Sequence, residues 1–93
     1  MKKLVLNEVV KGAYSNADGF TLLCILKTYF LNNEEVEVCM LGFPPMSSSF
    51  FNSSFGELIQ EFGIDKFKAI IKFKNITKSQ VSQIKMYLDF HLH

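Results

Sequence analysis

Short segments of apolar residues, spaced along the chain, are predicted to be strands. The first covers residues 4–10, the second residues 35–41 and the third residues 69–73. In the second segment, EVEVCML, polar and apolar residues alternate at first, and the last residues are all apolar. This pattern is typical of a strand that enters a core. The dipeptide KG ends the first strand and the run GFPP ends the second, because Gly and Pro favour turns.

Three longer segments have the spacing of helices. Residues 16–31 are apolar on nearly every side, and Ser15 with Asp18 has the spacing of a capping box at their start. Such a helix is either deeply sandwiched or presents a second apolar face to a partner. Residues 48–62 are predicted to form one helix with a single apolar face, composed of Phe51, Phe55, Leu58, Ile59 and Phe62.

The last helix begins after Thr77, which has capping-box spacing with Gln80, and its apolar stripe consists of Val81, Ile84, Leu88 and Leu92. The predicted order is β-α-β-α-β-α, and strands that alternate with helices favour a parallel sheet. We therefore predict an α/β fold, a small sandwich with a largely parallel sheet of three to four strands and about three helices. At 93 residues, the chain is expected to form a single domain over residues 1–93.

Composition and charge narrow the function mainly by exclusion. The chain is 48% apolar and 20% charged, and its net charge of +1 provides no strong field for nucleic acid or an anionic membrane. Lys72 and Lys74 are predicted to share one face of the third strand. No arginine accompanies them for base recognition, so we interpret these lysines as a solvated sheet edge and not as a nucleic-acid site.

The residues that could carry catalysis or bind a metal do not form a recognisable set. Cys24 and Cys39 lie in apolar surroundings without metal-ligand spacing, which predicts buried, reduced thiols in a cytoplasmic protein. His91 and His93 stand at the end of the sequence, where a solvated position is expected. Neither a phosphate-binding loop nor an apolar run of signal-peptide or membrane-spanning length is present. We predict a non-enzymatic cytoplasmic protein without a cofactor or metal.

The most informative segment is MSSSFFNSSFGEL at residues 46–58, where a strand gives way to a helix. Its serine hydroxyls are expected beside free backbone N–H groups at the positive end of the helix dipole, and capping needs only one of them. Helical spacing places Phe50 opposite the apolar stripe, where an exposed aromatic side chain is a suitable contact anchor. The alternative is that loop 42–46 folds over Phe50. We predict that the partner-binding residues are Ser47, Ser48, Ser49, Phe50, Ser53, Ser54 and Glu57.

The stretch GFPPMSSSFFNSSFGELIQEFG, followed by IIKFKN and a final helix, resembles the STAS-like bacterial domains of unknown function. That family is related to the STAS domains of anti-sigma factor antagonists. The resemblance covers residues 35–88, and SNADG at residues 15–19 is similar to the family's first helix start. It implies a STAS-like version of the small α/β sandwich.

In the antagonists, an Asp-Ser-Ser-Gly motif opens the corresponding helix, and a kinase-like anti-sigma factor phosphorylates one Ser. The resemblance places Ser47 at the Asp position, Ser48 at the phosphoacceptor and Phe50 at the Gly. Two positions therefore depart from the motif, because Ser47 lacks the negative charge and Phe50 is bulkier than Gly. A phosphate on Ser48 would add about −1.5 to −2 charges at the helix start.

From this resemblance we expect a regulatory protein-binding module that docks a partner, such as a histidine-kinase-like ATPase, through the serine-rich junction. The alternative is an inhibitor or accessory protein of a phage or mobile element that binds a host protein complex with the same fold. A homo-oligomer is a further expectation, because the predicted helix at residues 16–31 is apolar on nearly every side.

Overall fold

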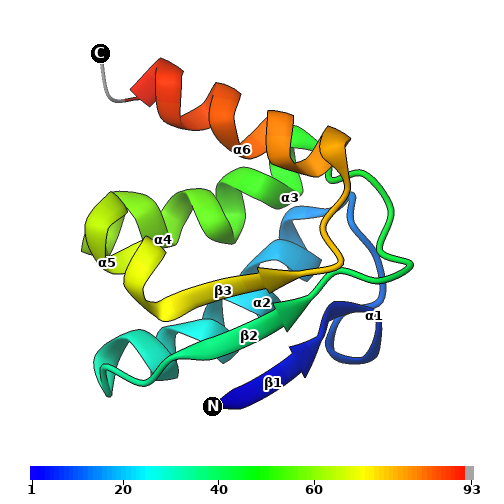
Figure 1. The fold of residues 1–93 in the computed structure, drawn as a ribbon. Coiled ribbons are helices and arrows are strands. Elements are labelled where there is room, and N and C mark those ends of the chain that lie inside the picture. Colours follow the sequence, from blue (N-terminus) through cyan, green and yellow to red (C-terminus); the bar gives the residue numbers. More distant parts are fainter. Residues whose placement is uncertain (92–93) are drawn as a thin grey trace.

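The computed structural model describes the backbone of residues 1–91 and the side chains of residues 1–89. Three strands, β1 (Lys2–Val5), β2 (Val36–Cys39) and β3 (Ile71–Lys74), form one parallel sheet in the order β1-β2-β3 (Figure 1). The parallel sheet and its connecting helices confirm the predicted α/β fold.

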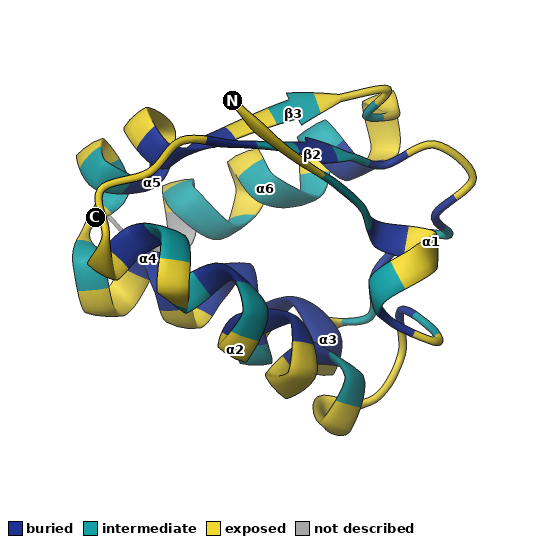
Figure 2. Ribbon diagram, turned by 90° about the horizontal axis from the view of Figure 1, so that it is seen from below, coloured by how far each residue is buried: buried dark blue, intermediate teal, exposed yellow. Residues whose placement is uncertain are grey.

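Helices pack on one face of the sheet and form a second layer (Figures 1 and 2). The long helix α2 (Asn16–Leu31) precedes β2, and three shorter helices, α3 (Ser48–Ser53), α4 (Phe55–Phe62) and α5 (Ile64–Ile70), connect β2 to β3. The last helix, α6 (Lys78–His91), follows β3 and runs beside α3 and α4.

The two faces of the sheet differ in burial because successive side chains of a strand point to opposite sides. Val36 and Val38 face the helices and are fully buried. Lys72 and Lys74 are exposed on the other face, as the sequence predicted. Across the part of the chain that the structure describes, no helix covers this second face (Figure 2).

The first predicted strand is too long, because β1 ends at Val5 and a short helix, α1 (Leu6–Val9), follows it. This helical turn brings Leu6 and Val10, which are four residues apart, to the same side, and both are buried. A continuous strand would also place Leu6 and Val10 on one face, so the apolar pattern alone could not distinguish the two conformations.

The single helix predicted for residues 48–62 is also wrong, because α3 and α4 are separated by a break at Ser54. The backbone of Ser54 has φ −117° and ψ −94°, which is not helical. The break allows Phe50, Phe51 and Phe55 all to be buried. A further unpredicted helix, α5, occupies the start of the segment that was expected to be the third strand.

The core joins the sheet to α2, α4 and α5 through a cluster of aromatic rings. The ring of Phe55 lies 5.4 Å from that of Phe73 and 6.0 Å from that of Phe67, both in edge-to-face geometry. The ring of Phe30 on α2 lies 6.3 Å from that of Phe67. These contacts hold the connecting helices against the sheet.

Both predicted capping boxes contain the expected caps. The Ser15 hydroxyl accepts a hydrogen bond of 3.1 Å from the Asp18 backbone N–H at the start of α2. At the start of α6, the Gln80 side chain accepts from the Thr77 N–H at 3.0 Å, and the Thr77 hydroxyl accepts from the Gln80 N–H at 3.1 Å. Both caps are formed by residues three positions apart, so short-range sequence is sufficient to predict them.

The apolar stripe of α6 is less buried than its pattern predicts. Val81, Ile84 and Leu88 are half-buried, and Leu92 lies outside the described residues. Gln80 is the one described residue of α6 that is fully buried, and its amide donates a hydrogen bond of 3.0 Å to the Phe43 carbonyl.

Candidate functional site

The serine-rich junction lies where the loop after β2 enters α3, and hydrogen bonds attach it to the segment before α2. The Ser47 hydroxyl caps α3 by accepting from the Phe50 N–H at 3.0 Å, and it donates to the Tyr14 carbonyl at 2.7 Å. The Ser47 N–H donates to the Ala13 carbonyl at 2.8 Å. Segments more than thirty residues apart in sequence therefore form one continuous surface.

Phe50 is not the exposed contact anchor that helical spacing predicted. Its side chain is fully buried, and its ring lies 5.6 Å from that of Phe43. Loop 42–46 thus folds over Phe50, which was the alternative considered above. Ser54 was predicted on the same outer face and is also fully buried, with its hydroxyl donating to the Phe50 carbonyl at 2.8 Å.

The remaining residues of the predicted partner-binding set reach the surface. Ser48, Ser49 and Glu57 are exposed, and Ser47 and Ser53 are half-buried. The Ser53 hydroxyl lies 2.9 Å from Asn16 Oδ1 and 2.8 Å from the Ser49 carbonyl. The structure thus brings together five of the seven predicted residues at the surface and places Phe50 and Ser54 in the core.

Two exposed aromatic residues beside this junction were not predicted as site residues. Tyr14 is 66% exposed and Phe20 is 62% exposed, although large aromatic side chains usually lie in the core. A shallow hollow beside Phe20 is also lined by Asn16, Leu23, Ser53 and Glu57. The sequence did contain a signal for an exposed apolar residue in the helix predicted at residues 16–31, because this segment has more apolar residues than one buried face can hold. We name the exposed set the junction surface; it consists of Tyr14, Asn16, Phe20, Ser48, Ser49, Ser53 and Glu57.

The junction surface rests on a close approach of α2 and α3 at Gly19. A Cβ atom at this position would lie 2.7 Å from the Phe50 carbonyl oxygen and 2.8 Å from the Ser53 Cβ. Glycine is therefore required for the two helices to lie this close, and the contact fixes their relative position.

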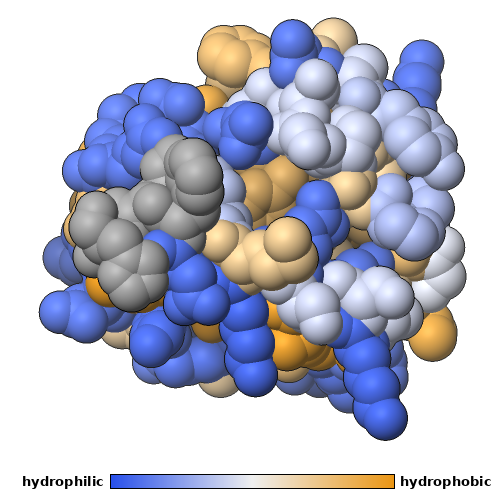
Figure 3. All heavy atoms as spheres, turned by 90° about the horizontal axis from the view of Figure 1, so that it is seen from above, coloured by the Kyte–Doolittle hydropathy of each residue, from blue (hydrophilic) through white to orange (hydrophobic). Residues whose placement is uncertain are grey.

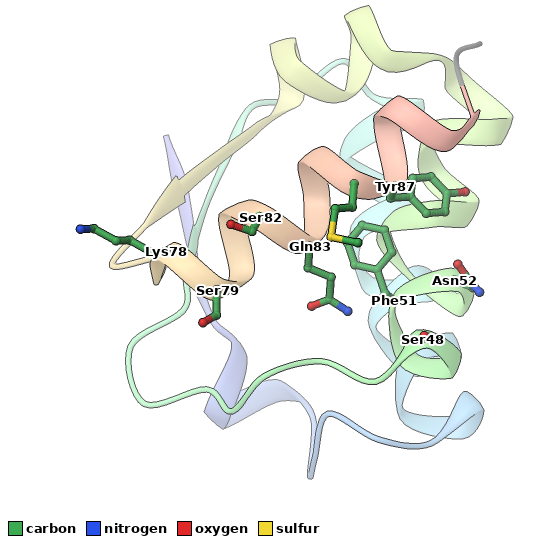
Figure 4. Close-up of a pocket in the computed structure, with 9 residues that line it drawn as sticks. Ser48, Phe51, Asn52, Lys78, Ser79, Ser82, Gln83 and Tyr87 are labelled. Atoms are coloured by element: carbon green, nitrogen blue, oxygen red, sulfur yellow. The ribbon is translucent and has the colours of Figure 1, made fainter.

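A larger hollow, of about 660 Å³, separates α3 from α6 (Figure 4). Ser48 and Phe51 of α3 and Ser82, Met86 and Tyr87 of α6 are among its lining residues. Seen from the α6 side, apolar residues are visible between hydrophilic ones (Figure 3). Ser48 thus belongs both to the junction surface and to the lining of this hollow.

The cysteines are more exposed than the sequence predicted. Cys24 is exposed on the outer side of α2, and Cys39 is half-buried on the open face of the sheet. Neither forms a disulfide. A hydrogen bond of 3.4 Å from the Asn75 amide to Cys39 Sγ lowers the pKa of this thiol. The side chains of His91 and His93 lie outside the described residues.

The described part of the chain shows neither a metal-binding cluster nor a helix able to span a membrane. Within it, no three His, Cys, Asp or Glu side chains are grouped closely enough to hold a metal ion. None of its helices has the length and apolar character needed to cross a membrane.

The parallel sheet with helices layered on one face, together with the serine-rich strand-to-helix junction, defines a small α/β domain of the kind that the STAS-like resemblance implies. Comparison with known families agrees, because the profile of the STAS-like domain of unknown function matches residues 22–81. The chain belongs to this family. No curated protein and no solved structure matches the chain.

Proposed function

We propose that this STAS-like domain is a non-enzymatic regulatory module that binds a protein partner through the junction surface. The observation that carries the proposal is the exposure of Tyr14 and Phe20 beside polar residues of the junction, since Phe20 shares a hollow with Ser53 and Glu57. Aromatic residues surrounded by polar groups are common anchors of protein interfaces, since they bury a large area with few rotatable bonds.

Hydrogen bonds connect the two chain segments that form the junction surface, and this favours binding. These bonds run from Ser47 to Ala13 and Tyr14, and from Ser53 to Asn16. A surface whose side chains are held in place loses less conformational entropy when a partner binds. The surface therefore suits a partner that recognises a fixed shape.

A histidine-kinase-like ATPase is the partner that we propose, with Ser48 as the phosphoacceptor. Ser48 is exposed in the first turn of α3, and no hydrogen bond engages its hydroxyl among the described residues. The neighbouring Ser47 hydroxyl is engaged in two hydrogen bonds, which makes it a poorer acceptor. A phosphate on Ser48 would place a charge of about −1.5 to −2 within the junction surface and change its affinity for the partner.

The proposal is tested by titrating the purified chain with a candidate ATPase of the source organism and measuring affinity by calorimetry. We expect Phe20→Ala and Tyr14→Ala each to weaken binding about tenfold or more. Leu31→Ala is the matched control, because Leu31 is equally exposed (65%) but lies at the opposite end of α2. Equal affinities for all of these variants would exclude the junction surface.

Phosphorylation requires a separate assay. The chain is incubated with the ATPase and ATP, and the modified residue is located by mass spectrometry in the wild type, Ser48→Ala and Ser49→Ala. We expect Ser48→Ala alone to abolish incorporation. A pull-down with wild-type and Phe20→Ala baits addresses the alternative, since recovery of an unrelated host complex by the wild type alone would favour an inhibitor function.

A further inference from the structure

An apolar groove of about 280 Å³ runs along α6, on the side away from the junction surface. One wall of the groove is α6, and the other is formed by α5 and β3. Eight of its ten lining residues are apolar. Among them, Ile84 and Leu88 of α6 are only half-buried, so the apolar stripe of this helix is not fully covered by the domain itself.

The two other lining residues are lysines on opposite walls, Lys68 on α5 and Lys85 on α6. They belong to residues 66–88, a stretch with six lysines and no acidic residue. Asp65 and Asp89 flank this stretch, and neither lines the groove. Among the described side chains, no carboxylate forms an ion pair with Lys68 or Lys85. Asp65 stands three residues before Lys68 on α5, and Asp89 stands four residues after Lys85 on α6, but neither forms an ion pair with these lysines. The groove therefore combines an apolar floor with two cations that are not engaged in ion pairs.

We propose that this groove binds a free medium-chain carboxylate of the fatty-acid class. The alkyl chain lies on the apolar floor, and the carboxylate lies between the amines of Lys68 and Lys85. Burying methylene groups supplies most of the affinity, and the lysines select for an anion.

The size of the groove favours a single alkyl chain over a protein segment. Its volume of about 280 Å³ is near the lower end of the range for small-molecule sites, about 300–1,000 Å³. A docked protein segment needs far more surface, since a stable interface buries about 800 Å² on each partner. The site is separate from the junction surface, so its presence or absence does not bear on the function proposed above.

Nuclear magnetic resonance tests the proposal on the full chain labelled with ¹⁵N. Decanoate is titrated below its micelle concentration, with decanol and decyltrimethylammonium as neutral and cationic probes of equal chain length. We expect decanoate to shift amide signals of α5, β3 and α6, and to bind at least about fivefold more tightly than decanol. Equal affinity for decanoate and decanol would overturn the proposal, as would shifts confined to the hollow between α3 and α6.

Substitution of the two lysines tests where the carboxylate of decanoate binds. Lys68→Gln and Lys85→Gln are each expected to weaken decanoate binding roughly two- to fivefold and to leave decanol binding unchanged. Lys11→Gln is the matched control, because Lys11 is exposed but does not line the groove. The proposal is wrong if Lys11→Gln weakens binding as much as the other two. It is also wrong if a leucine- and glutamate-rich helical peptide binds the groove more tightly than decanoate, because the natural ligand would then be a protein segment.

Discussion

Helices α2 and α6 are both attached to the body of the domain, but by different physical means. At Gly19, α2 approaches α3 so closely that a Cβ atom would lie 2.7 Å from a backbone oxygen, and Leu22, Leu26 and Phe30 are fully buried. This attachment rests on close packing. It supports the junction surface, because it sets the position of α2 relative to α3.

Helix α6 is attached by half-buried apolar side chains, such as Tyr87 with its ring 4.9 Å from that of Phe51, together with several polar side chains. Gln80 donates to the Phe43 carbonyl, Gln83 donates to the Met46 carbonyl at 2.7 Å, and the Tyr87 hydroxyl donates to the Gly56 carbonyl at 3.1 Å. A hollow or groove lies on each side of this helix. The difference teaches that an apolar stripe in the sequence does not by itself show how a helix is held. Substitutions in the two helices should therefore lower the free energy of unfolding by different amounts.

The largest difference is expected between two leucines. Leu26→Ala on α2 should lower the free energy of unfolding by about 2–5 kcal/mol, because it leaves a cavity at a fully buried position. Leu88→Ala on α6 should cost less than about 1.5 kcal/mol, because Leu88 is half-buried beside a groove. Urea denaturation measures both values. Equal losses would show that α6 is packed as tightly as α2.

The contact at Gly19 provides the next test. We expect Gly19→Ala to destabilise the domain by about 1–3 kcal/mol, because the added methyl group meets the Phe50 carbonyl and the Ser53 side chain. Gly12→Ala is a control, since its Cβ would lie at an ordinary 3.5 Å from Asp18 Oδ2. Unfolding curves that do not separate the two variants would mean that α2 and α3 can move apart without cost.

The polar attachment of α6 is tested at Gln80. Its replacement by Ala removes one half of the capping box and the hydrogen bond to the Phe43 carbonyl, which is expected to cost about 1–2 kcal/mol. Gln83→Ala removes one hydrogen bond at a half-buried position and should cost about 0.5–1.5 kcal/mol. A larger loss for Gln83 than for Gln80 would contradict the expectation that the buried residue, which also completes the cap, contributes more.

The smallest expected effect is a change in the reactivity of the Cys39 thiol. The Asn75 amide lowers the pKa of Cys39, so the pH midpoint for its reaction with a thiol reagent should lie below that of an ordinary cysteine. In Asn75→Gly the amide is lost while the backbone φ of 57° remains allowed, and the midpoint should move to higher pH. Labelling rates are measured in a Cys24→Ser background. An unchanged midpoint would show that the hydrogen bond is not responsible.

Features that depend on neighbouring residues could be predicted from the sequence. The caps at Ser15 and Thr77 involve residues three positions apart, and each forms as the spacing indicates. The parallel sheet follows from the alternation of strands with helical segments, which the chain can only connect by crossing over. The start of the helix at Ser48 was predicted correctly, because the prolines at positions 44 and 45 end the preceding segment and the serines that follow favour an N-cap.

The position of Phe50 could not be predicted, because it depends on tertiary contacts. Its burial requires loop 42–46 to fold back and bring Phe43 to the Phe50 ring, and also requires the helix to break at Ser54. A periodic pattern assumes one straight helix and therefore assigned Phe50 and Ser54 to the wrong face. Tyr14 and Phe20 were missed for the converse reason, because aromatic residues are normally assigned to a core.

The polar attachment of α6 also has a consequence for heat capacity. A helix that buries less apolar surface also exposes less of it to water when the helix separates from the domain. The heat-capacity change of that step is therefore smaller. The hydrophobic contribution that holds α2 against the sheet weakens on cooling, whereas hydrogen bonds such as Gln83 to Met46 do not share this temperature dependence. Cooling is therefore expected to weaken the packing of α2 proportionally more than the attachment of α6, although α2 is the more deeply buried helix.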